Sequence, residues 1–248
     1  MDEFAGIAET YDWTERSTDE IPFFAELAAK AQGPILEIGA GTGRITVPIA
    51  KLGKPVTALD ISRAMLSRAQ AKWDAEGDSQ EVSFVIGDFR TLSLNRKYGL
   101  IIAPGRTFEH AISDADRQEA FSRCHAHLQN SGILAMYVWG PPSDADPAPP
   151  EKSRMIEPTD EHGCLQFSWR EERDFGRELR RHYFRVEEVD GRRRTWKHDP
   201  IELRWYTPEM LDALGEVVDL TVHSRFDDFR GSPYRRGSLH MIWLYRKQ

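Results

Sequence analysis

The sequence predicts an α/β fold built on a doubly wound, mostly parallel sheet, and two observations carry this prediction. Short apolar runs, typical of strands that are buried on both faces, alternate with stretches long enough for helices. A glycine-rich turn, GAGTGR (39–44), directly follows the first of these runs. Because parallel strands need crossover connections, and helices supply them, the alternation indicates βαβ units with right-handed crossovers.

Five strands are expected in the first part of the chain. An amphipathic helix comes before them, reaches about Gln32 and is ended by Gly33 and Pro34. The strands are expected at 35–38, 56–60, 82–88, 99–104 and 133–139. Helices between them are expected at 44–52, from the cap Ser62 to about residue 73, and over a stretch that includes Leu128 and stops at 130–132.

A proline-rich segment interrupts the alternation. Five prolines lie between Pro141 and Pro150, which excludes a helix or an inner strand there. Beyond them apolar and polar residues alternate, with turns expected at 174–176 and at Asp190-Gly191, so three strands of an inserted antiparallel β-meander are predicted. A helix over 208–214, capped by Thr207, and strands at 217–226 and 239–246 complete a seven-stranded sheet. The link between these strands is too short for a crossover, so the last strand is expected to be antiparallel.

This pattern divides the chain into residues 1–140 with 207–248, which form the sheet domain, and residues 141–206, which form the proline-rich loop and the meander. A length of 248 residues suits one large domain with a small subdomain. The net charge of −7 argues against nucleic acid as a partner, and no apolar run is long enough to suggest a membrane partner. The N-terminal stretch lacks a secretory pattern and the two cysteines form no metal-binding cluster, so we expect a cytoplasmic protein without a metal.

The glycine turn and the end of the next strand indicate a nucleoside-containing ligand. Gly39, Gly41 and Gly43 stand where a buried strand turns at once into a helix and a ligand approaches the backbone. Asp60 ends the following strand, where a carboxylate can accept hydrogen bonds from ribose hydroxyls. Glu37, on the strand below, suits the ammonium group of an amino-acid tail better than a pyrophosphate.

ILEIGAGTGR, VTALDIS, VSFVIGDF and GLIIAP, in this order, resemble the motifs of class I S-adenosylmethionine-dependent methyltransferases, in particular small-molecule members with methyltransferase domains of types 25 and 11. The resemblance covers residues 33 to about 139. It implies a Rossmann-like sheet and S-adenosylmethionine (SAM) as cofactor, with S-adenosylhomocysteine as its product. It also implies that the following residues surround the cofactor: Tyr11, Glu37, Gly39, Ala40, Gly41, Gly43, Asp60, Ile61, Met65, Gly87, Asp88, Phe89, Ala103 and Pro104.

Two residues after the fourth strand are the candidate catalytic side chains. His110 could take a proton from the acceptor, because an unperturbed imidazole has a pKa near 6.5, or it could serve as a helix cap. Arg106 could bind a carboxylate or phosphate of the substrate, or pair with Glu109 or Asp114. The predicted function is methyl transfer to nitrogen or oxygen of a small metabolite. A nicotinamide-dependent oxidoreductase is the first alternative, although Arg44 replaces the glycine that its motif needs, and a non-catalytic SAM-binding protein is the second.

The meander is expected to cover the substrate pocket or to contact a second copy in a homodimer. Between Ser168 and Tyr206, eleven Lys/Arg stand against nine Asp/Glu, so solvated cross-strand ion pairs are expected rather than a basic binding face. Candidate aromatic walls of the pocket are Trp169, Tyr183, Trp196, Trp205 and Tyr206. A second candidate for substrate contact is the loop 231–238, which contains Tyr234, Arg235 and Arg236.

Overall fold

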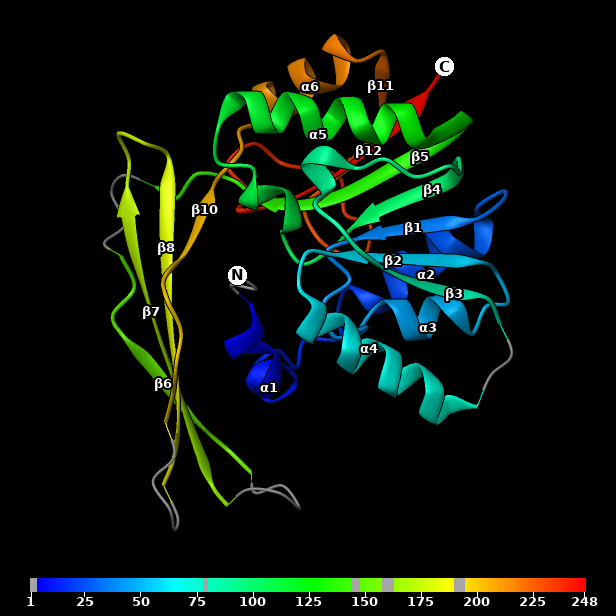
Figure 1. Ribbon diagram of the computed structural model, residues 1–248. Helices are drawn as coiled ribbons and strands as arrows, with labels where there is room; N and C mark the ends of the chain where they lie inside the picture. Colours follow the sequence, from blue (N-terminus) through cyan, green and yellow to red (C-terminus); the bar gives the residue numbers. More distant parts are fainter. Residues whose placement is uncertain (1–3, 78–79, 144–147, 158–162, 190–194) are drawn as a thin grey trace.

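Two sheets lie side by side in the computed structural model, which describes residues 4–77, 80–143, 148–157, 163–189 and 195–248 (Figure 1). The larger sheet has seven strands in the order β11-β12-β5-β4-β1-β2-β3. The pairs among β1 to β5 are parallel, whereas β12 runs antiparallel to both β5 and β11. The predicted fold class is confirmed. The strands span β1 (Ile35–Ile38), β2 (Val56–Asp60), β3 (Val82–Ile86), β4 (Tyr98–Ala103), β5 (Leu128–Trp139), β11 (Leu220–Phe226) and β12 (His240–Lys247).

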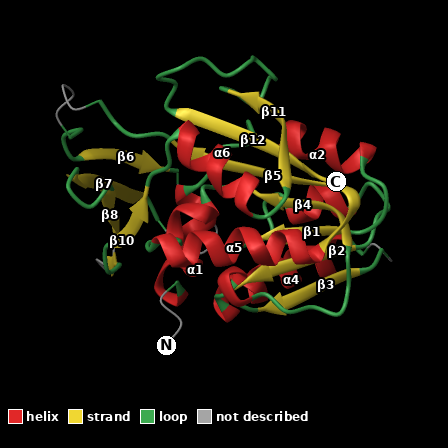
Figure 2. Cartoon of the chain, turned by 90° about the horizontal axis from the view of Figure 1, so that it is seen from above, coloured by secondary structure: helices red, strands yellow, loops and turns green. Residues whose placement is uncertain are grey.

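Helices cover both faces of this sheet (Figures 1 and 2). One face carries α2 (Ile21–Lys30), α3 (Thr46–Ala50) and α4 (Arg63–Glu76), and the other carries α5 (Asp114–His127) and α6 (Pro208–Val217). Residues 89–91 and 107–110 form short 3₁₀ turns, η1 and η2. The predicted caps of α4 and α6 are confirmed. The Ser62 hydroxyl accepts a hydrogen bond from the backbone N–H of Met65, and the Thr207 hydroxyl accepts one from that of Met210, both at 3.2 Å.

Several boundaries of the sheet domain differ from the prediction: β3 ends at Ile86 rather than at residue 88, α3 is shorter than the predicted 44–52, and α5 ends at His127, before Leu128. Strand β5 begins at Leu128 rather than at residue 133, because the chain leaves α5 and pairs at once with Tyr98 of β4, carrying the polar residues 129–131 along as an exposed extension of the strand. Helix α6 continues to Val217, and β11 starts only after Asp219, whose positive φ of 58° turns the chain. A first helix, α1 (Ala5–Thr14), was not anticipated, since its buried face includes only two apolar residues, Ile7 and Ala8.

The inserted segment is an antiparallel sheet of five strands instead of the predicted three. Its strands are β6 (Lys152–Ile156), β7 (Leu165–Asp174), β8 (Leu179–Glu188), β9 (Thr195–Lys197) and β10 (Ile201–Arg204). The order is β10-β8-β7-β6, and β9 also pairs with β8. Strand β6 escaped prediction because four of its five residues are exposed, so it lacks an apolar pattern, and β9 has only three residues. The expected turn after residue 174 is confirmed, whereas the one at Asp190-Gly191 lies outside the described residues.

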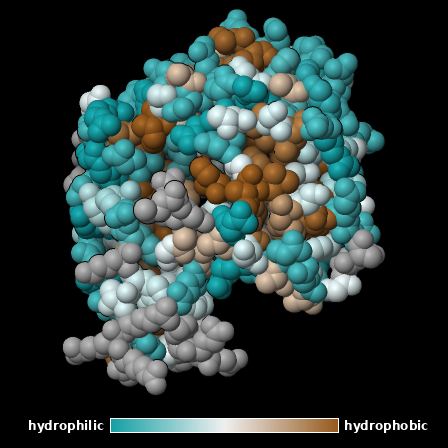
Figure 3. Space-filling view, viewed as in Figure 1, coloured by the Kyte–Doolittle hydropathy of each residue, from teal (hydrophilic) through white to brown (hydrophobic). Residues whose placement is uncertain are grey.

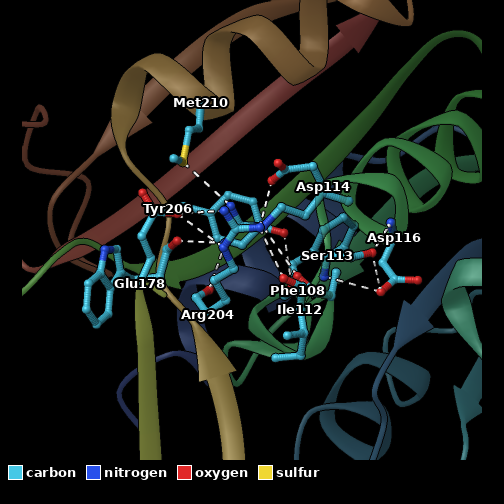
Figure 4. A network of polar contacts seen from close by, with 12 residues as sticks. Phe108, Ile112, Ser113, Asp114, Asp116, Glu178, Arg204, Tyr206 and Met210 are labelled. Atoms are coloured by element: carbon cyan, nitrogen blue, oxygen red, sulfur yellow. Dashed lines mark hydrogen bonds and ion pairs between the residues drawn. The ribbon is translucent and has the colours of Figure 1, made fainter. Parts of the chain in front are cut away.

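A polar junction fastens the returning strand β10 to the start of α5. Arg204 donates to the Glu178 and Asp114 carboxylates, each at 2.7 Å, and to the carbonyl oxygen of Ile112 at 3.1 Å (Figure 4). Asp114 therefore pairs with Arg204 and not with Arg106. Beneath it, Arg117 is 2% exposed and donates to the carbonyl oxygens of residues 111, 204 and 205, while its guanidinium lies 4.0 Å from the ring centroid of Tyr206. The junction thus fixes where the second sheet sits.

Replacing the buried guanidinium should cost much more stability than replacing an exposed one on the same helix. Arg117→Ala leaves three buried carbonyl oxygens without donors, and each such acceptor costs about 1–3 kcal/mol, so we expect a loss of about 3 kcal/mol or more. The control Arg123→Ala removes an exposed pair with Glu119 and should cost less than about 0.5 kcal/mol. Urea unfolding measures both values, and equal losses would contradict the proposed role of the junction.

Candidate functional site

A cleft of about 1580 Å³ lies between the carboxyl ends of the parallel strands and the inner face of the second sheet. In the space-filling view, apolar atoms gather at the surface in the hollow between the two sheets (Figure 3). Ligand pockets typically measure about 300–1,000 Å³. The cleft therefore has room for more than one small molecule, and its place at the carboxyl edge of the sheet is where open α/β folds bind ligands.

The structure brings most of the predicted site residues together in this cleft. Those that line it are Tyr11, Glu37, Gly39, Ala40, Gly41, Asp60, Ile61, Met65, Gly87, Asp88, Phe89, Pro104, Arg106 and His110. Gly43 and Ala103 do not line it. Ala103 is fully buried in the core, and a side chain at Gly43 would meet the Cβ of Ala69 in α4 at 3.0 Å. Gly43 thus permits close packing of helices, which is a different task from contacting a ligand.

The other two glycines of the turn, Gly39 and Gly41, have different surroundings. Both have positive φ, 72° at Gly39 and 56° at Gly41, in the left-handed region that glycine adopts readily. A Cβ at Gly39 would come within 2.2 Å of the Thr107 hydroxyl. The absence of a side chain at Gly39 therefore lets the side chain of Thr107, after β4, pack against the backbone of the turn. A Cβ at Gly41 would meet nothing within 4 Å, so this part of the turn is open to a ligand.

Asp60 is held rigidly at the end of β2. One carboxylate oxygen accepts a hydrogen bond from the backbone N–H of Gly41 and the other from that of Ser62, both at 2.8 Å. Each carboxylate oxygen thus has a backbone donor, and these two bonds fix the orientation of the carboxylate. Asp88, by contrast, is engaged by Arg90, whose hydrogen bonds outweigh the effect of burial and hold the pKa of the Asp88 carboxyl below its usual value.

Glu37 places a neutral acid beneath the glycine turn. Its side chain is 1% exposed and accepts a hydrogen bond from the Thr46 hydroxyl at 2.5 Å. Burial raises the pKa of Glu37 to about 8, against the smaller opposing effect of the Thr46 hydrogen bond. The carboxyl is therefore mostly protonated at pH 7. A ligand ammonium beside it would favour the ionised form, so the site fits a zwitterionic amino-acid group.

Helix α1 forms a wall of the cleft beside the glycine turn. Asp12 accepts hydrogen bonds from the Thr42 hydroxyl in the glycine turn at 2.6 Å and from Lys72 of α4 at 2.7 Å. These contacts hold Tyr11, one position earlier, at the wall of the cleft. Burial, with a smaller contribution from Glu15, raises the pKa of Tyr11 to about 12, so its phenol stays protonated and can donate a hydrogen bond.

The opposite half of the cleft is formed by η2, the end of β5 and the second sheet. Arg106 lies over the Trp139 ring, 4.1 Å from its centroid, and has no ion pair with a described residue. His110 contacts the Phe4 ring edge-to-face at 5.5 Å between ring centroids. Burial, together with the charge of Arg106, lowers the pKa of His110 to about 4, so the value expected from a free imidazole does not hold. His110 is neutral at pH 7.

The inserted sheet contributes residues that the sequence did not single out. Phe167, His182, Phe184 and Val186 line the cleft together with the anticipated Trp169. Cross-strand register explains the set, because Trp169 faces Phe184 and Phe167 faces Val186 on the inner side of β7 and β8. Period-two alternation within these strands was the signal that could have found them. Tyr137 and His240 also line the cleft, joined by a hydrogen bond of 2.6 Å between the phenol and the imidazole Nδ1.

Other aromatic candidates have structural places. Tyr183 points to the outer face and donates to Glu172 at 2.6 Å, while Trp196 packs edge-to-face on Trp13. Trp205 and Tyr206 are buried at the junction. In the loop 231–238, Tyr234 packs on Trp243, Arg235 pairs with Asp227 at 2.8 Å, and Arg236 is exposed, so none of the three lines the cleft. Cross-strand ion pairs do occur on the meander, for example between Arg181 and Glu202 at 2.7 Å.

The seven-stranded sheet with an antiparallel last strand, the glycine turn after β1 and the carboxylate at the end of β2 are the features that the resemblance to class I methyltransferases implies. Residues 35–132 match the family model described as a methyltransferase domain, so the resemblance predicted from the sequence is confirmed for this part of the chain. The chain is 30% identical over 143 residues to the malonyl-[acyl-carrier protein] O-methyltransferase 1 of Ilyobacter polytropus. The aligned region covers 55% of this chain and 50% of that protein.

Solved structures extend the likeness to the whole fold. The CcbJ methyltransferase of Streptomyces caelestis superposes with a TM-score of 0.82 at 23% identity, covering 100% of this chain and 99% of that one. SAM-bound CalS10, an amino pentose methyltransferase from Micromonospora echinaspora, gives a TM-score of 0.73 at 18% identity, covering 98% and 96%. Because the superpositions cover nearly the whole chain, they show that the fold is shared, including the inserted sheet. The chain spans about half or less of the length of the first curated relatives it matches, at 22%, 54% and 45%.

Within the described part of the chain, no helix combines the length and the apolar character needed to cross a membrane.

Stability should fall with rising pH because of Glu37. Burial raises its pKa in the folded state from the ordinary 4.5 of a glutamate to about 8, so between these values folding binds a proton that unfolding releases. The stabilisation is complete below about pH 4.5 and is lost as the pH rises towards 8. We expect the free energy of unfolding of the wild type, relative to Glu37→Gln, to fall by about 1.4 kcal/mol per pH unit from pH 5 to 7.5. Parallel urea titrations test this, and a pH-independent difference would contradict the neutral buried acid.

Proposed function

We propose that the chain catalyses the transfer of a methyl group from SAM to a nitrogen or oxygen atom of a small molecule. The observation that carries the proposal is the cradle formed by the open turn at Gly41, the oriented carboxylate of Asp60 and the buried acid Glu37, within the segment that matches a methyltransferase domain. SAM would supply a methyl group that its positively charged sulfur activates for attack. The task left to the protein is chiefly to position the reactants, which can lower a barrier by roughly 7–11 kcal/mol.

The cleft residues divide into groups that match parts of SAM. The Asp60 carboxylate would accept the ribose hydroxyls and the Glu37 carboxyl would receive the amino group. Ile61, Met65 and Phe89 would enclose the adenine, with Gly87 and Asp88 at its edge, and Ala40 and Pro104 would flank the methionine part. The buried acid Glu37 suits an ammonium group, which would favour its ionised form, better than a pyrophosphate, whose negative charge would oppose that ionisation. This supports SAM over the nicotinamide alternative.

The acceptor would enter from the second half of the cleft. We propose that residues 1–140 with 207–248 hold the cofactor, and that residues 141–206 cover the acceptor. The lining of the cleft by β7 and β8 supports this covering role for the insert more directly than a dimer contact. Arg106 and His110 would contact the acceptor, Arg106 as a hydrogen-bond donor and His110 as a neutral imidazole. The names of the relatives include both O- and N-directed enzymes, which suits either kind of acceptor atom.

The decisive experiment combines binding with turnover. Calorimetry should show that the protein binds S-adenosylhomocysteine but not NAD(H). Incubation with methyl-labelled SAM and a panel of small amines, phenols and alcohols should transfer label to at least one of them. Absence of binding to both SAM and S-adenosylhomocysteine would overturn the proposal. Binding without any transfer would instead favour a non-catalytic SAM-binding protein.

Asp60→Ala should weaken the binding of S-adenosylhomocysteine by about 1–3 kcal/mol, as expected when hydrogen bonds to a charged group are lost. The variant also frees the N–H of Gly41, which the wild-type carboxylate holds. Arg63→Ala, at the exposed start of the adjacent helix α4, is the matched control and should leave the affinity unchanged. Calorimetric titration measures both, and an unaltered affinity of Asp60→Ala would remove the ribose contact from the proposal.

His110→Ala should lower turnover while sparing the cofactor. We expect the affinity for S-adenosylhomocysteine to stay within about twofold, since the imidazole faces the acceptor half of the cleft, while kcat/KM falls by about 10-fold or more, as for a lost positioning contact. Label-transfer assays with the acceptor found in the panel provide the measurement. Unchanged turnover would exclude His110 from the reaction.

A further inference from the structure

A histidine and a glutamate face each other on the inner side of the second sheet. His182 of β8 and Glu171 of β7 are directly opposed in the antiparallel register, and the imidazole Nε2 lies 3.1 Å from a Glu171 carboxylate oxygen. Both side chains are about nine-tenths buried, at 11% and 10% exposure. His182 lines the cleft, on the side that the proposed acceptor would occupy. The pair thus combines an enclosed setting with access to the ligand space.

The other partner of Glu171 fixes the charge state of the pair. Arg173 donates a hydrogen bond to the second carboxylate oxygen at 2.5 Å. Although burial opposes ionisation, the hydrogen bonds from His182 and Arg173 hold the pKa of Glu171 at about 2. Because the ionised carboxylate can only accept hydrogen bonds, Nε2 must carry the proton of the neutral imidazole. The lone pair of that ring then resides on Nδ1, for which no described residue provides a hydrogen-bond partner.

The charges around His182 keep it neutral yet able to accept a proton. The groups whose charge acts on it are Glu171 on β7, Arg180 on β8, and Arg106 and His110 in the segment after β4, while Arg173 on β7 acts on Glu171. Burial, followed by the positive charges of Arg106 and Arg180, lowers the pKa of His182, while Glu171 opposes the shift. An imidazolium formed on His182 would be stabilised by the adjacent carboxylate, which is the part that an orienting acid plays for a histidine base.

His110 lacks this support. Its ring contacts Phe4 and experiences the charges of Arg106 and Arg90, and no hydrogen bond joins it to a carboxylate of a described residue. An imidazolium there would be both desolvated and repelled. Of His110 and His182, His182 is therefore the better proton acceptor, although it lies in the inserted sheet, some seventy positions further along the chain.

We infer that His182 takes the proton of the methyl acceptor and that Glu171 is its positioning residue. This inference rests on the proposed function. In the step, the X–H bond of the acceptor would break, and its proton would pass to Nδ1 of His182. The electron pair left on X would form the bond to the methyl carbon. The bond between that carbon and the sulfur of SAM would break at the same time, and its electron pair would go to the sulfur of the departing S-adenosylhomocysteine. The imidazolium later returns the proton to water. The acceptor atom would therefore arrive protonated, as a hydroxyl or an ammonium group.

The first test is the dependence of kcat on pH, measured with the acceptor that the panel identifies. Wild-type kcat should decline on the acidic side as His182 becomes protonated. His182→Gln should lack this limb and lose about 10²–10⁴-fold in kcat, as for removal of a general base. Glu171→Gln should move the limb to lower pH and reduce its plateau by about 10- to 100-fold. His223→Gln, an exposed histidine on β11, is the control and should match the wild type.

A second measurement needs no acceptor. Nitrogen-15 spectra of the imidazole rings, recorded with and without S-adenosylhomocysteine, should show His182 as the tautomer protonated on Nε2, and its pKa should drop in Glu171→Gln. A proton on Nδ1 would overturn the inference, as would a His182→Gln variant with unchanged kcat and pH profile. Failure to bind S-adenosylhomocysteine would refute the proposed function instead, so the two failures can be told apart.

Discussion

The arrangement of the molecule depends on a buried charge pair where the two sheets meet. The Arg180 guanidinium, 1% exposed on β8, lies 3.6 Å from the Glu109 carboxylate, which is fully buried after β4. Glu109 also accepts the backbone N–H of Trp139 at 2.7 Å, and Arg180 donates to the carbonyl oxygen of Gly140. Since a buried charge without a partner costs several kcal/mol, each residue requires the other in place. This requirement ties the end of β5, the segment after β4 and the inserted sheet into one unit.

Because both sheets line the cleft, it has two chemically different halves. The half built by the parallel sheet has rigid backbone donors and acidic groups, Asp60 and Glu37, close to the glycine turn. The half built by the insert and the segment after β4 has an aromatic strip on β7 and β8, the cation Arg106 and the histidines His110 and His182, among others. The first half suits a charged, sugar-containing ligand. The second half would enclose the proposed methyl acceptor and place titratable rings beside it, which suits the proposed methyl transfer.

The charge states of the cleft residues follow from burial and from neighbouring groups together, more than from residue type. Glu37 is neutral and Glu171 ionised at pH 7, although both are buried glutamates, because only Glu171 receives hydrogen bonds from two cationic or polar partners, Arg173 and His182. His110 and His182 likewise differ, since one has an aromatic neighbour and the other a carboxylate. The same side chain therefore performs different tasks at different depths and beside different partners.

The sequence alone determined the parallel sheet, the antiparallel last strand, the glycine turn, Asp60 at the end of β2 and the caps Ser62 and Thr207, because each is set by short-range pattern or backbone preference. It did not reveal α1 or β6, whose patterns are weak, nor the start of β5 at Leu128, which pairing with β4 decides. Only the tertiary structure brought His182 and Glu171 to the cleft and shifted the pKa of His110, since burial and neighbouring charge come from segments far apart in the chain.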